Sequence, residues 1–312
     1  MHQYDGILLC DKPYGQTSHD VVDSLRVLLE QKKIGHTGTL DPLATGLMVI
    51  CLGKATKIAR FITEIDKTYE AEITLGQCSP TYDAEGIGPE IVSEKVPDLN
   101  KAEIESVLSS FEGANKQKVP LFSAVKVNGR RLYKSARKGK IVKTPERDIF
   151  IKSIKLIGFE LPRVNFEVTC SKGTYIRTIA NDIGEKVGCG AYLSGLKRTR
   201  VGSYILADAL TLEEVDLFKK DGSLTKYIKP IESVLPFPSI TVTEEFGSLI
   251  ISGRSPRQKD IVAVEGEFQP EETISLRDFN GKIMAIGKSE ICSSELDNYK
   301  GKSFFTYIRV LN

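Results

Sequence analysis

Alternating hydrophobic and polar residues predict one strand clearly, and apolar runs predict two more. Residues 68–76, TYEAEITLG, place Tyr69, Ala71, Ile73 and Leu75 on one side and Glu70, Glu72 and Thr74 on the other. A period of two residues predicts a half-buried antiparallel strand, which Tyr69 leads. The runs GILLC (6–10) and LMVICLG (47–53) predict buried strands.

Two stretches have the apolar spacing of an amphipathic helix. Residues 19–33 carry Val21, Val22, Leu25 and Leu29 on one side, after a start at Thr17 and Asp20 that resembles a capping box. Residues 165–188 predict a strand, a turn at Gly173 and a helix with Ile176, Ile179 and Ile183 on its inner side.

Arg177 falls in the first turn of the second predicted helix. The helix dipole opposes a cation at that end, so the arginine needs another reason to be there. We expect a carboxylate from elsewhere in the fold to be its partner.

The loops around the first two predicted strands are rich in small residues. KPYGQTS (12–18) connects a strand to a helix, and GHTGTLDPLATG (35–46) leads into the next strand. The second loop contains a single carboxylate, Asp41, among glycine, threonine and small apolar residues.

The composition is that of an ordinary soluble globular protein. The chain has 312 residues, of which 41% are hydrophobic and 27% charged, enough for one large domain and a smaller one. Its six scattered cysteines include no CxxC pair and are interpreted as reduced core thiols. Without a signal peptide or an apolar stretch of about 18 residues, a cytoplasmic protein outside the membrane is expected.

Charge is distributed unevenly along the chain. Residues 116–143 hold ten Lys and Arg and no Asp or Glu, and because the whole chain carries +2, the remainder is −8. Phe122 and Tyr133 lie within this basic segment, where they can stack on bases or ribose. The segment predicts a contact with nucleic acid rather than a merely solvated face.

The last quarter of the chain reads as a separate unit. KPIESVLPFPS (229–239) resembles a linker because of its prolines. The stretches TVTEEFG, ISLRDFNGKIMAIGKS and FFTYIRVLN that follow predict short strands and turns, and therefore a small β-rich domain.

Several common chemistries find no support in the residues. GLMVICLGKAT lacks the first glycine and the final hydroxyl of a phosphate loop. YDAEG (82–86) has two acids but not the other ligands of a calcium loop, and is interpreted as a turn. Three histidines without an HExxH spacing give little material for a catalytic zinc site or a Ser-His-Asp triad.

Four motifs in order resemble the TruB family of tRNA pseudouridine synthases. They are KPYGQTS, GHTGTLDPLATG, KTYEAEITLG and SKGTYIRTIANDIGEKVGCGAYLSGLKRT. The resemblance implies an α+β catalytic domain on a mixed, mostly antiparallel sheet at residues 1–235, with a basic RNA-clamping insert at about 116–143. It also implies a PUA-like RNA-binding domain at 238–312. One departure, GQCSPTYDAEG, replaces a more polar run typical of bacterial members.

The resemblance also implies a reaction and its residues. Uridine at position 55 in the TΨC arm of tRNA would become pseudouridine without metal or cofactor, in a monomer that needs no guide RNA. Asp41 would attack covalently or act as a base, Arg177 would keep it charged, and Tyr69 would stack on the flipped uracil. His36 would fill the space that the base leaves, Tyr175 and Leu196 would line the pocket, and Lys12 would brace the loop. Lys126, Arg130 and Arg131 of the insert would hold RNA.

Two alternatives remain open at this point. One is an RNA-binding or RNA-folding protein with a vestigial pocket. The other is an enzyme of the same chemistry that works within a guide-RNA particle.

Overall fold

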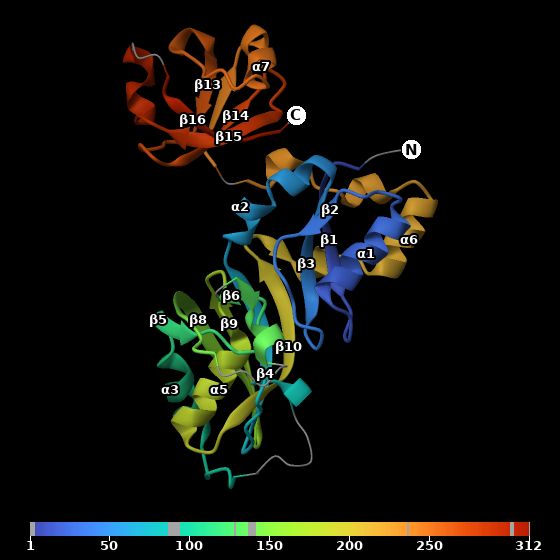
Figure 1. The fold of residues 1–312 in the computed structure, drawn as a ribbon, viewed down its shortest axis with the longest axis vertical. Helices are drawn as coiled ribbons and strands as arrows, with labels where there is room; N and C mark the ends of the chain where they lie inside the picture. The colour runs from blue at the N-terminus through green and yellow to red at the C-terminus, as the bar shows by residue number, and fades with distance from the viewer. Residues whose placement is uncertain are drawn as a thin grey trace.

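A computed structural model describes residues 4–86, 94–127, 129–136, 142–235, 237–299 and 303–311. Within these ranges, the chain forms one large mixed sheet, a separate smaller sheet and a two-stranded hairpin, with helices packed against them (Figure 1). The expected α+β architecture with a β-rich C-terminal part is confirmed.

The large sheet has nine strands among the described residues, and most neighbours are antiparallel. β3 and β10 form a parallel pair, while β11 and β2 pair with β10 and β3 beside the main path. The main path runs β1 (Gly6–Lys12), β3 (Thr45–Leu52), β10 (Ala191–Val201), β4 (Lys67–Leu75), β9 (Arg163–Cys170), β8 (Glu146–Glu160) and β5 (Gly113–Lys118); the side strands are β2 (Ile34–His36) and β11 (Tyr204–Ile205).

Helices cover the large sheet and connect its strands. Thr17 and Asp20 form the expected capping box at the start of α1, which ends at Leu28, earlier than the apolar pattern predicts. The α-helices of this part are α1 (Ser18–Leu28), α2 (Ala59–Thr63), α3 (Lys101–Ser109), α4 (Leu132–Ala136), α5 (Ile176–Val187) and α6 (Leu212–Lys220). The 3-10 helices are η1 (Gly53–Lys57), η2 (Ala84–Gly86), η3 (Leu206–Asp208), η4 (Leu224–Tyr227) and η5 (Ile231–Ser233).

Two apolar cores explain the strand patterns. On β1, Leu8 and Cys10 pack with the cluster that includes residues of α1 and α5, whereas Ile7 and Leu9 pack into a second cluster on the other face. Burial on both faces accounts for the continuous apolar runs of β1 and β3. In β4 the Tyr69 side of the alternating pattern is buried and Glu70 is exposed, as predicted.

The C-terminal sheet has the order β13-β12-β14-β15-β16. Its strands are β12 (Ser239–Val242), β13 (Ile261–Glu265), β14 (Thr273–Arg277), β15 (Ile283–Ser289) and β16 (Phe305–Val310), with α7 (Glu244–Ile250), η6 (Gln258–Asp260) and η7 (Ser293–Asn298). The TVTEEFG stretch, expected to contribute short strands and turns, ends β12 and begins a helix, because Thr243 caps α7 by accepting a hydrogen bond from the Phe246 N–H.

Two further expectations need correction. The stretch 229–239 is not a free linker, because Lys229 and Ile7 exchange backbone hydrogen bonds of 2.8 Å and both Val234 and Leu235 are buried. All six cysteines are free, but Cys78 is exposed and Cys292 half-buried, so only four are core thiols. Isolated thiol positions give no periodic signal from which burial can be predicted.

Candidate active site

The loop that carries Asp41 joins β2 to β3 and is held by the KPYGQTS segment. The Lys12 ammonium donates to the carbonyl oxygens of Pro13 and Pro42 at 2.9 and 3.2 Å. The Gly15 N–H also donates to Pro42 O, at 2.9 Å. The buried Lys12 side chain therefore fixes the backbone next to Asp41, and its pKa is lowered mainly by burial.

Close backbone packing fixes the far end of the same loop. Gly46 has φ +98°, and a Cβ on it would lie 2.4 Å from the Arg198 carbonyl oxygen of β10. Only glycine fits this approach between β3 and β10 without displacing one of them.

The Arg177 guanidinium contacts three oxygen atoms from separate parts of the chain, two through hydrogen bonds and one through an ion pair. Its Nη1 lies 3.1 Å from Asp83 Oδ2 and 3.6 Å from Asp41 Oδ2. Its Nη2 donates to the Phe122 carbonyl oxygen at 2.8 Å. The carboxylate partner expected from the position of Arg177 in the first turn of α5 is thus present twice.

The sequence interpretation missed Asp83. The YDAEG stretch is a turn, as expected, and Asp83 Oδ1 accepts the Glu85 N–H at 3.1 Å, but the carboxylate is buried against Arg177. The only signal available was the unexplained Arg177, which called for an acid without saying which one.

The pKa of the Asp41 carboxyl is raised above its ordinary value. Burial raises the pKa of its carboxyl, Arg177 opposes the rise, Asp83 adds to it, and Lys12 opposes it more weakly. The side chain still exposes 43% of its surface, because it faces a cavity rather than protein atoms. Asp41 is therefore enclosed by the protein yet reachable by a ligand.

Tyr69 lies across the same cavity with a second buried arginine beside it. Burial raises the pKa of the Tyr69 hydroxyl, and the charge of Arg198 together with a hydrogen bond from it opposes the rise. Arg198 is 2% exposed and donates from Nε to Leu47 O at 2.6 Å and from Nη2 to Gly38 O at 3.1 Å. Sequence reasoning did not single out Arg198.

The cavity has a volume of about 320 Å³ and brings together five of the predicted residues. They are Asp41, Tyr69, Tyr175, Arg177 and Leu196, and the lining also includes the cations Lys67, Arg147, Lys172 and Arg198. One acid surrounded by cations and aromatic rings suits an anionic ligand that carries a flat ring.

The remaining predicted residues lie outside this lining. Lys12 acts on the backbone of the loop, as described above, and His36 lies on β2 with its ring centroid 6.4 Å from that of His19. Burial is the main cause that lowers the pKa of His36. Lys126, Arg130 and Arg131 are exposed on the β6 (Lys126–Val127) and β7 (Arg130–Arg131) hairpin.

The basic segment is tied to the cavity at its base. Gln117 of β5 exchanges two hydrogen bonds with the backbone of Tyr175, at 2.8 and 3.0 Å. Phe122, Ser123 and Ala124 then line the cavity itself. Residues 137–141 of the segment lie outside the described residues.

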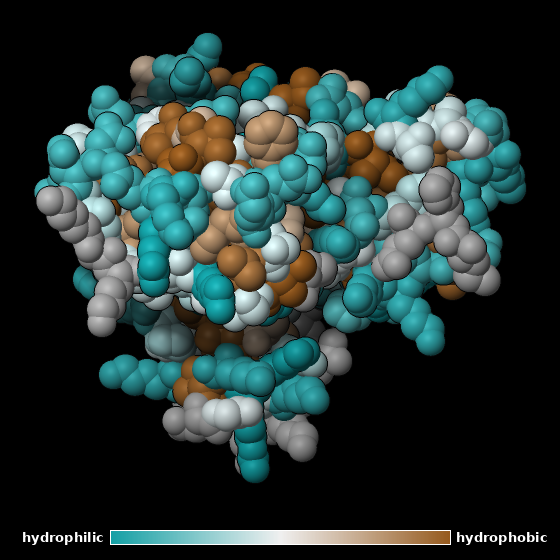
Figure 2. Space-filling view, turned by 90° about the horizontal axis from the view of Figure 1, so that it is seen from above, coloured by the Kyte–Doolittle hydropathy of each residue, from teal (hydrophilic) through white to brown (hydrophobic). Residues whose placement is uncertain are grey.

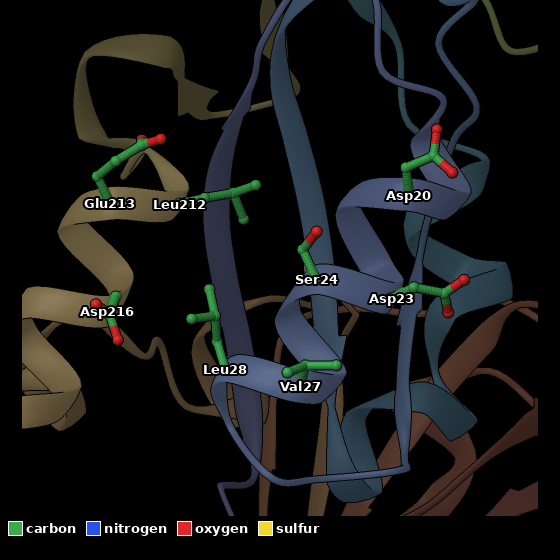
Figure 3. Close-up of a pocket in the computed structure, with 8 residues that line it drawn as sticks. All are labelled: Asp20, Asp23, Ser24, Val27, Leu28, Leu212, Glu213 and Asp216. Carbon is green, nitrogen blue, oxygen red and sulfur yellow. The ribbon is translucent and has the colours of Figure 1, made fainter.

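A larger groove of about 710 Å³ lies between α1 and α6 (Figure 3). Its lining combines the carboxylates of Asp20, Asp23, Glu213 and Asp216 with apolar side chains. None of the predicted site residues lines it, and carboxylates repel phosphate, so this groove does not suit an RNA substrate.

Three protein-family models match consecutive stretches of the chain. Residues 26–176 match the TruB family pseudouridylate synthase (N terminal domain), residues 177–236 the tRNA pseudouridylate synthase B C-terminal domain, and residues 238–311 the PUA domain. The tRNA pseudouridine synthase B of Pseudomonas fluorescens is 39% identical over 91% of this chain and 91% of its own. The Clostridium kluyveri enzyme of the same name is 44% identical over 83% of this chain and 88% of its own.

The chain belongs to the TruB family. It is therefore a pseudouridine synthase, an isomerase that converts uridine to pseudouridine in tRNA. Its TruB fold is also found in a Cbf5-Nop10-Gar1 complex, with a TM-score of 0.77 and 26% identity over 98% of this chain and 85% of the other. An H/ACA RNP bound to a substrate RNA matches with the same TM-score of 0.77 and 24% identity. At this identity the match shows a shared fold only.

No helix among the described residues of this TruB chain is long and apolar enough to span a bilayer.

Proposed function

We propose that the chain isomerises uridine 55 in the TΨC arm of tRNA, with the target base flipped into the cavity and Asp41 as the catalytic carboxylate. The observation that carries the proposal is the Asp41–Arg177 pair in a cavity that Tyr69 also lines. A pocket used only for binding RNA has no need of an enclosed acid held beside a cation.

The reaction rearranges bonds within one nucleotide. The N1–C1′ bond breaks, the uracil turns, a C5–C1′ bond forms, and the proton on C5 moves to N1. Asp41 promotes the first step either by covalent attack or by taking a proton from the sugar. Both routes need an ionised carboxylate, and Arg177 favours that form by opposing the effect of burial.

The other residues that line the cavity act on the base. Tyr69 offers a ring face on which uracil can stack, and its hydroxyl relays the proton leaving C5. Tyr175 and Leu196 close the apolar walls. Because a base inside a folded RNA loop must leave its stack, His36 occupies the space it vacates, and Lys12 holds the Asp41 loop in place.

The basic insert holds the RNA arm, and a strand pairing supports this role. Lys126 lies directly opposite Arg131 in the β6–β7 hairpin, and the neighbouring Arg130 lies opposite Val127. Like charges in facing positions destabilise a hairpin. A bound polyanion would neutralise them, so this pairing supports RNA binding by the insert.

The same proposal covers the remaining features of the chain. Residues 1–235 form the catalytic domain and 238–312 a PUA-like RNA-binding domain. The protein acts as a monomer in the cytoplasm, without guide RNA. The observation that favours independence is the insert itself, whose ten Lys and Arg and no Asp or Glu give this chain a basic surface of its own for the RNA arm.

One experiment tests the proposal. The purified protein is incubated alone with an unmodified tRNA transcript, and pseudouridine is mapped along the RNA. We expect modification at position 55 with the wild type and none with Asp41→Asn, while both bind the transcript equally. No product from the wild type, product at another position, or turnover of a few per cent by Asp41→Asn would each refute part of the proposal. Product that appears only after a guide RNA is added would favour the guide-dependent alternative.

A further inference from the structure

A buried glutamine of the basic insert is attached to the start of the helix that carries Arg177. On the face seen from the end of the C-terminal sheet, most surface residues are hydrophilic (Figure 2). Gln117 of β5, by contrast, is 3% exposed. Burying an amide is costly unless its donor and its acceptor both find partners. Both partners of Gln117 belong to one residue, Tyr175, which lies 58 positions further along the chain.

Gln117 binds the backbone of Tyr175 in the way that a neighbouring strand would. Its Oε1 accepts the Tyr175 N–H at 2.8 Å, and its Nε2 donates to Tyr175 O at 3.0 Å. Tyr175 is the N-cap residue of α5, and its side chain makes no capping hydrogen bond. Because the N–H groups at a helix start have no partner within the helix, Gln117 supplies one from another strand.

The residue opposite Gln117 on the next strand holds the same segment. Arg147 of β8 pairs with Gln117 in the sheet. Its Nη1 donates to Gly173 O at 2.9 Å, and its guanidinium carbon lies 5.1 Å from the centroid of the Tyr175 ring. Residues 173–175, which line the cavity, are thus fixed by side chains from both β5 and β8.

The position of Arg177 depends on this attachment. Arg177 follows Tyr175 by two residues, in the first turn of α5. Among the described residues, its buried Nε has no hydrogen-bond partner, so the guanidinium is held through its Nη atoms. One of them, Nη2, donates to Phe122 O at 2.8 Å. Residues 117–122 therefore contact both the backbone from which Arg177 extends and the end of its side chain.

We propose that Gln117 is a positioning residue for the isomerisation. By holding Tyr175 it fixes the start of α5, so that Arg177 Nη1 stays 3.6 Å from Asp41 Oδ2. The proposal rests on the proposed function in that Asp41 is the catalytic carboxylate. Gln117 is not one of the described residues that line the cavity, so it acts through Arg177 and not on the substrate.

The test compares two substitutions on one face of β5, where side chains two positions apart point the same way. Gln117→Met keeps the length of the side chain but removes both hydrogen bonds to Tyr175. Asn115→Leu is the matched control, because Asn115 Nδ2 donates to Phe111 O and Gly113 O at 2.7 and 3.0 Å and neither acceptor lines the cavity. Each variant loses two hydrogen bonds to the backbone, but only Gln117→Met loosens the start of α5.

Single-turnover rates on saturating tRNA, tRNA affinities and melting temperatures are measured for both variants and wild type. We expect Gln117→Met to react roughly 10- to 100-fold more slowly, since a displacement of about 1 Å at the site costs about 100-fold. Its tRNA affinity should stay within about twofold of wild type, because the exposed Lys116 and Lys118 of β5 can reach phosphate and the buried Gln117 cannot. Asn115→Leu should keep the wild-type rate.

A double variant shows whether Gln117 acts through Arg177. If Gln117→Met slows the reaction by displacing the guanidinium, its effect should largely disappear once Arg177→Lys has removed the guanidinium. Added to Arg177→Lys, it should slow the reaction by no more than about threefold further, because substitutions that act on one contact are not additive.

The other outcomes overturn the positioning role. A Gln117→Met rate equal to that of Asn115→Leu would mean that Gln117 only stabilises the fold. A loss that disappears at saturating tRNA would make Gln117 an RNA-binding residue, and a full loss on top of Arg177→Lys would separate it from Arg177. Turnover by Asp41→Asn refutes the proposed function instead, and the comparison of Gln117→Met with Asn115→Leu still decides whether Gln117 positions the site.

Discussion

Arg177 lies closer to Asp83 than to Asp41, with its Nη1 3.1 Å from Asp83 Oδ2 and 3.6 Å from Asp41 Oδ2. The Arg177 and Asp83 side chains are 6% and 7% exposed, whereas Asp41 faces the cavity. Asp83 thus anchors the guanidinium, and the guanidinium in turn lies beside Asp41, the proposed catalytic acid.

Asp83→Asn should therefore reduce both stability and activity. Removing one partner of a buried ion pair leaves an uncompensated charge, which costs about 3 kcal/mol of the free energy of unfolding. Freed from Asp83, Arg177 can shift relative to Asp41, so the single-turnover rate should also fall. Denaturant unfolding and rapid-quench kinetics measure the two effects.

Glu85→Gln is the matched control for Asp83→Asn. Glu85 is an exposed acid of the same loop, so its variant should stay within about 0.5 kcal/mol of wild type. An Asp83→Asn variant as stable and as fast as Glu85→Gln would contradict the anchoring role.

Arg177→Lys should fold but react slowly. Lysine keeps the charge, but its single ammonium cannot reach Asp83, Asp41 and Phe122 O in the way the planar guanidinium does. A displacement of Asp41 by about 1 Å is enough for roughly a 100-fold loss of rate. Circular dichroism checks the fold and single-turnover kinetics the rate, and a near-normal rate would refute the pairing.

Asp41→Asn should stabilise the folded protein at neutral pH. Because burial raises the pKa of Asp41 above its ordinary value, the stability linked to its proton is present below the unfolded pKa and is lost as pH rises through the folded pKa. Above the folded pKa of Asp41, the wild type holds an ionised, enclosed carboxylate that the variant lacks.

Melting temperatures of both proteins at pH 7 and near pH 4 check this expectation. The advantage of Asp41→Asn should be largest at pH 7 and shrink in acid, where Asp41 is protonated. Wild-type turnover should fall over the same acidic range, because both proposed routes need the ionised acid. An Asp41→Asn variant that is less stable than wild type at pH 7 would contradict the predicted gain in stability.

Tyr69→Phe should separate binding from chemistry. Phenylalanine keeps the ring face for uracil but lacks the hydroxyl that we propose as the relay for the C5 proton, so tRNA affinity should persist while product formation is lost. The hydroxyl is also a partner of Arg198, and a thermal melt shows whether its removal disturbs the fold. Product formation at the wild-type rate would leave Tyr69 with a structural role alone.

The basic insert is tested by replacing Arg130, Arg131 and Lys134 together with Gln. The variant should bind tRNA more weakly at low salt and show a salt slope lower by about 2.1 to 2.7, from three lost phosphate contacts. All three side chains are exposed, so thermal stability should hardly change. Salt slopes and tRNA affinities equal to those of wild type would mean that the insert does not bind RNA and is only a solvent-exposed charged surface.

Local patterns in the sequence predicted most of the elements around the site. Strand β4 follows from its two-residue alternation, the start of α1 from Thr17 and Asp20, and the inner face of α5 from its isoleucines, because each pattern reflects burial on one side of a single element. The identities of Asp41, Tyr69 and Arg177 followed from motifs that are continuous in the sequence.

The tertiary structure alone decided which residues meet. Asp83 and Arg177 are 94 positions apart, and nothing in a turn sequence such as YDAEG shows that its acid will be buried against a helix on the far side of the chain. Arg198 looks like an ordinary cation in GLKRT, yet it is 2% exposed because β10 runs between β3 and β4. Periodicity records how one element is buried, whereas these contacts depend on how separate elements pack.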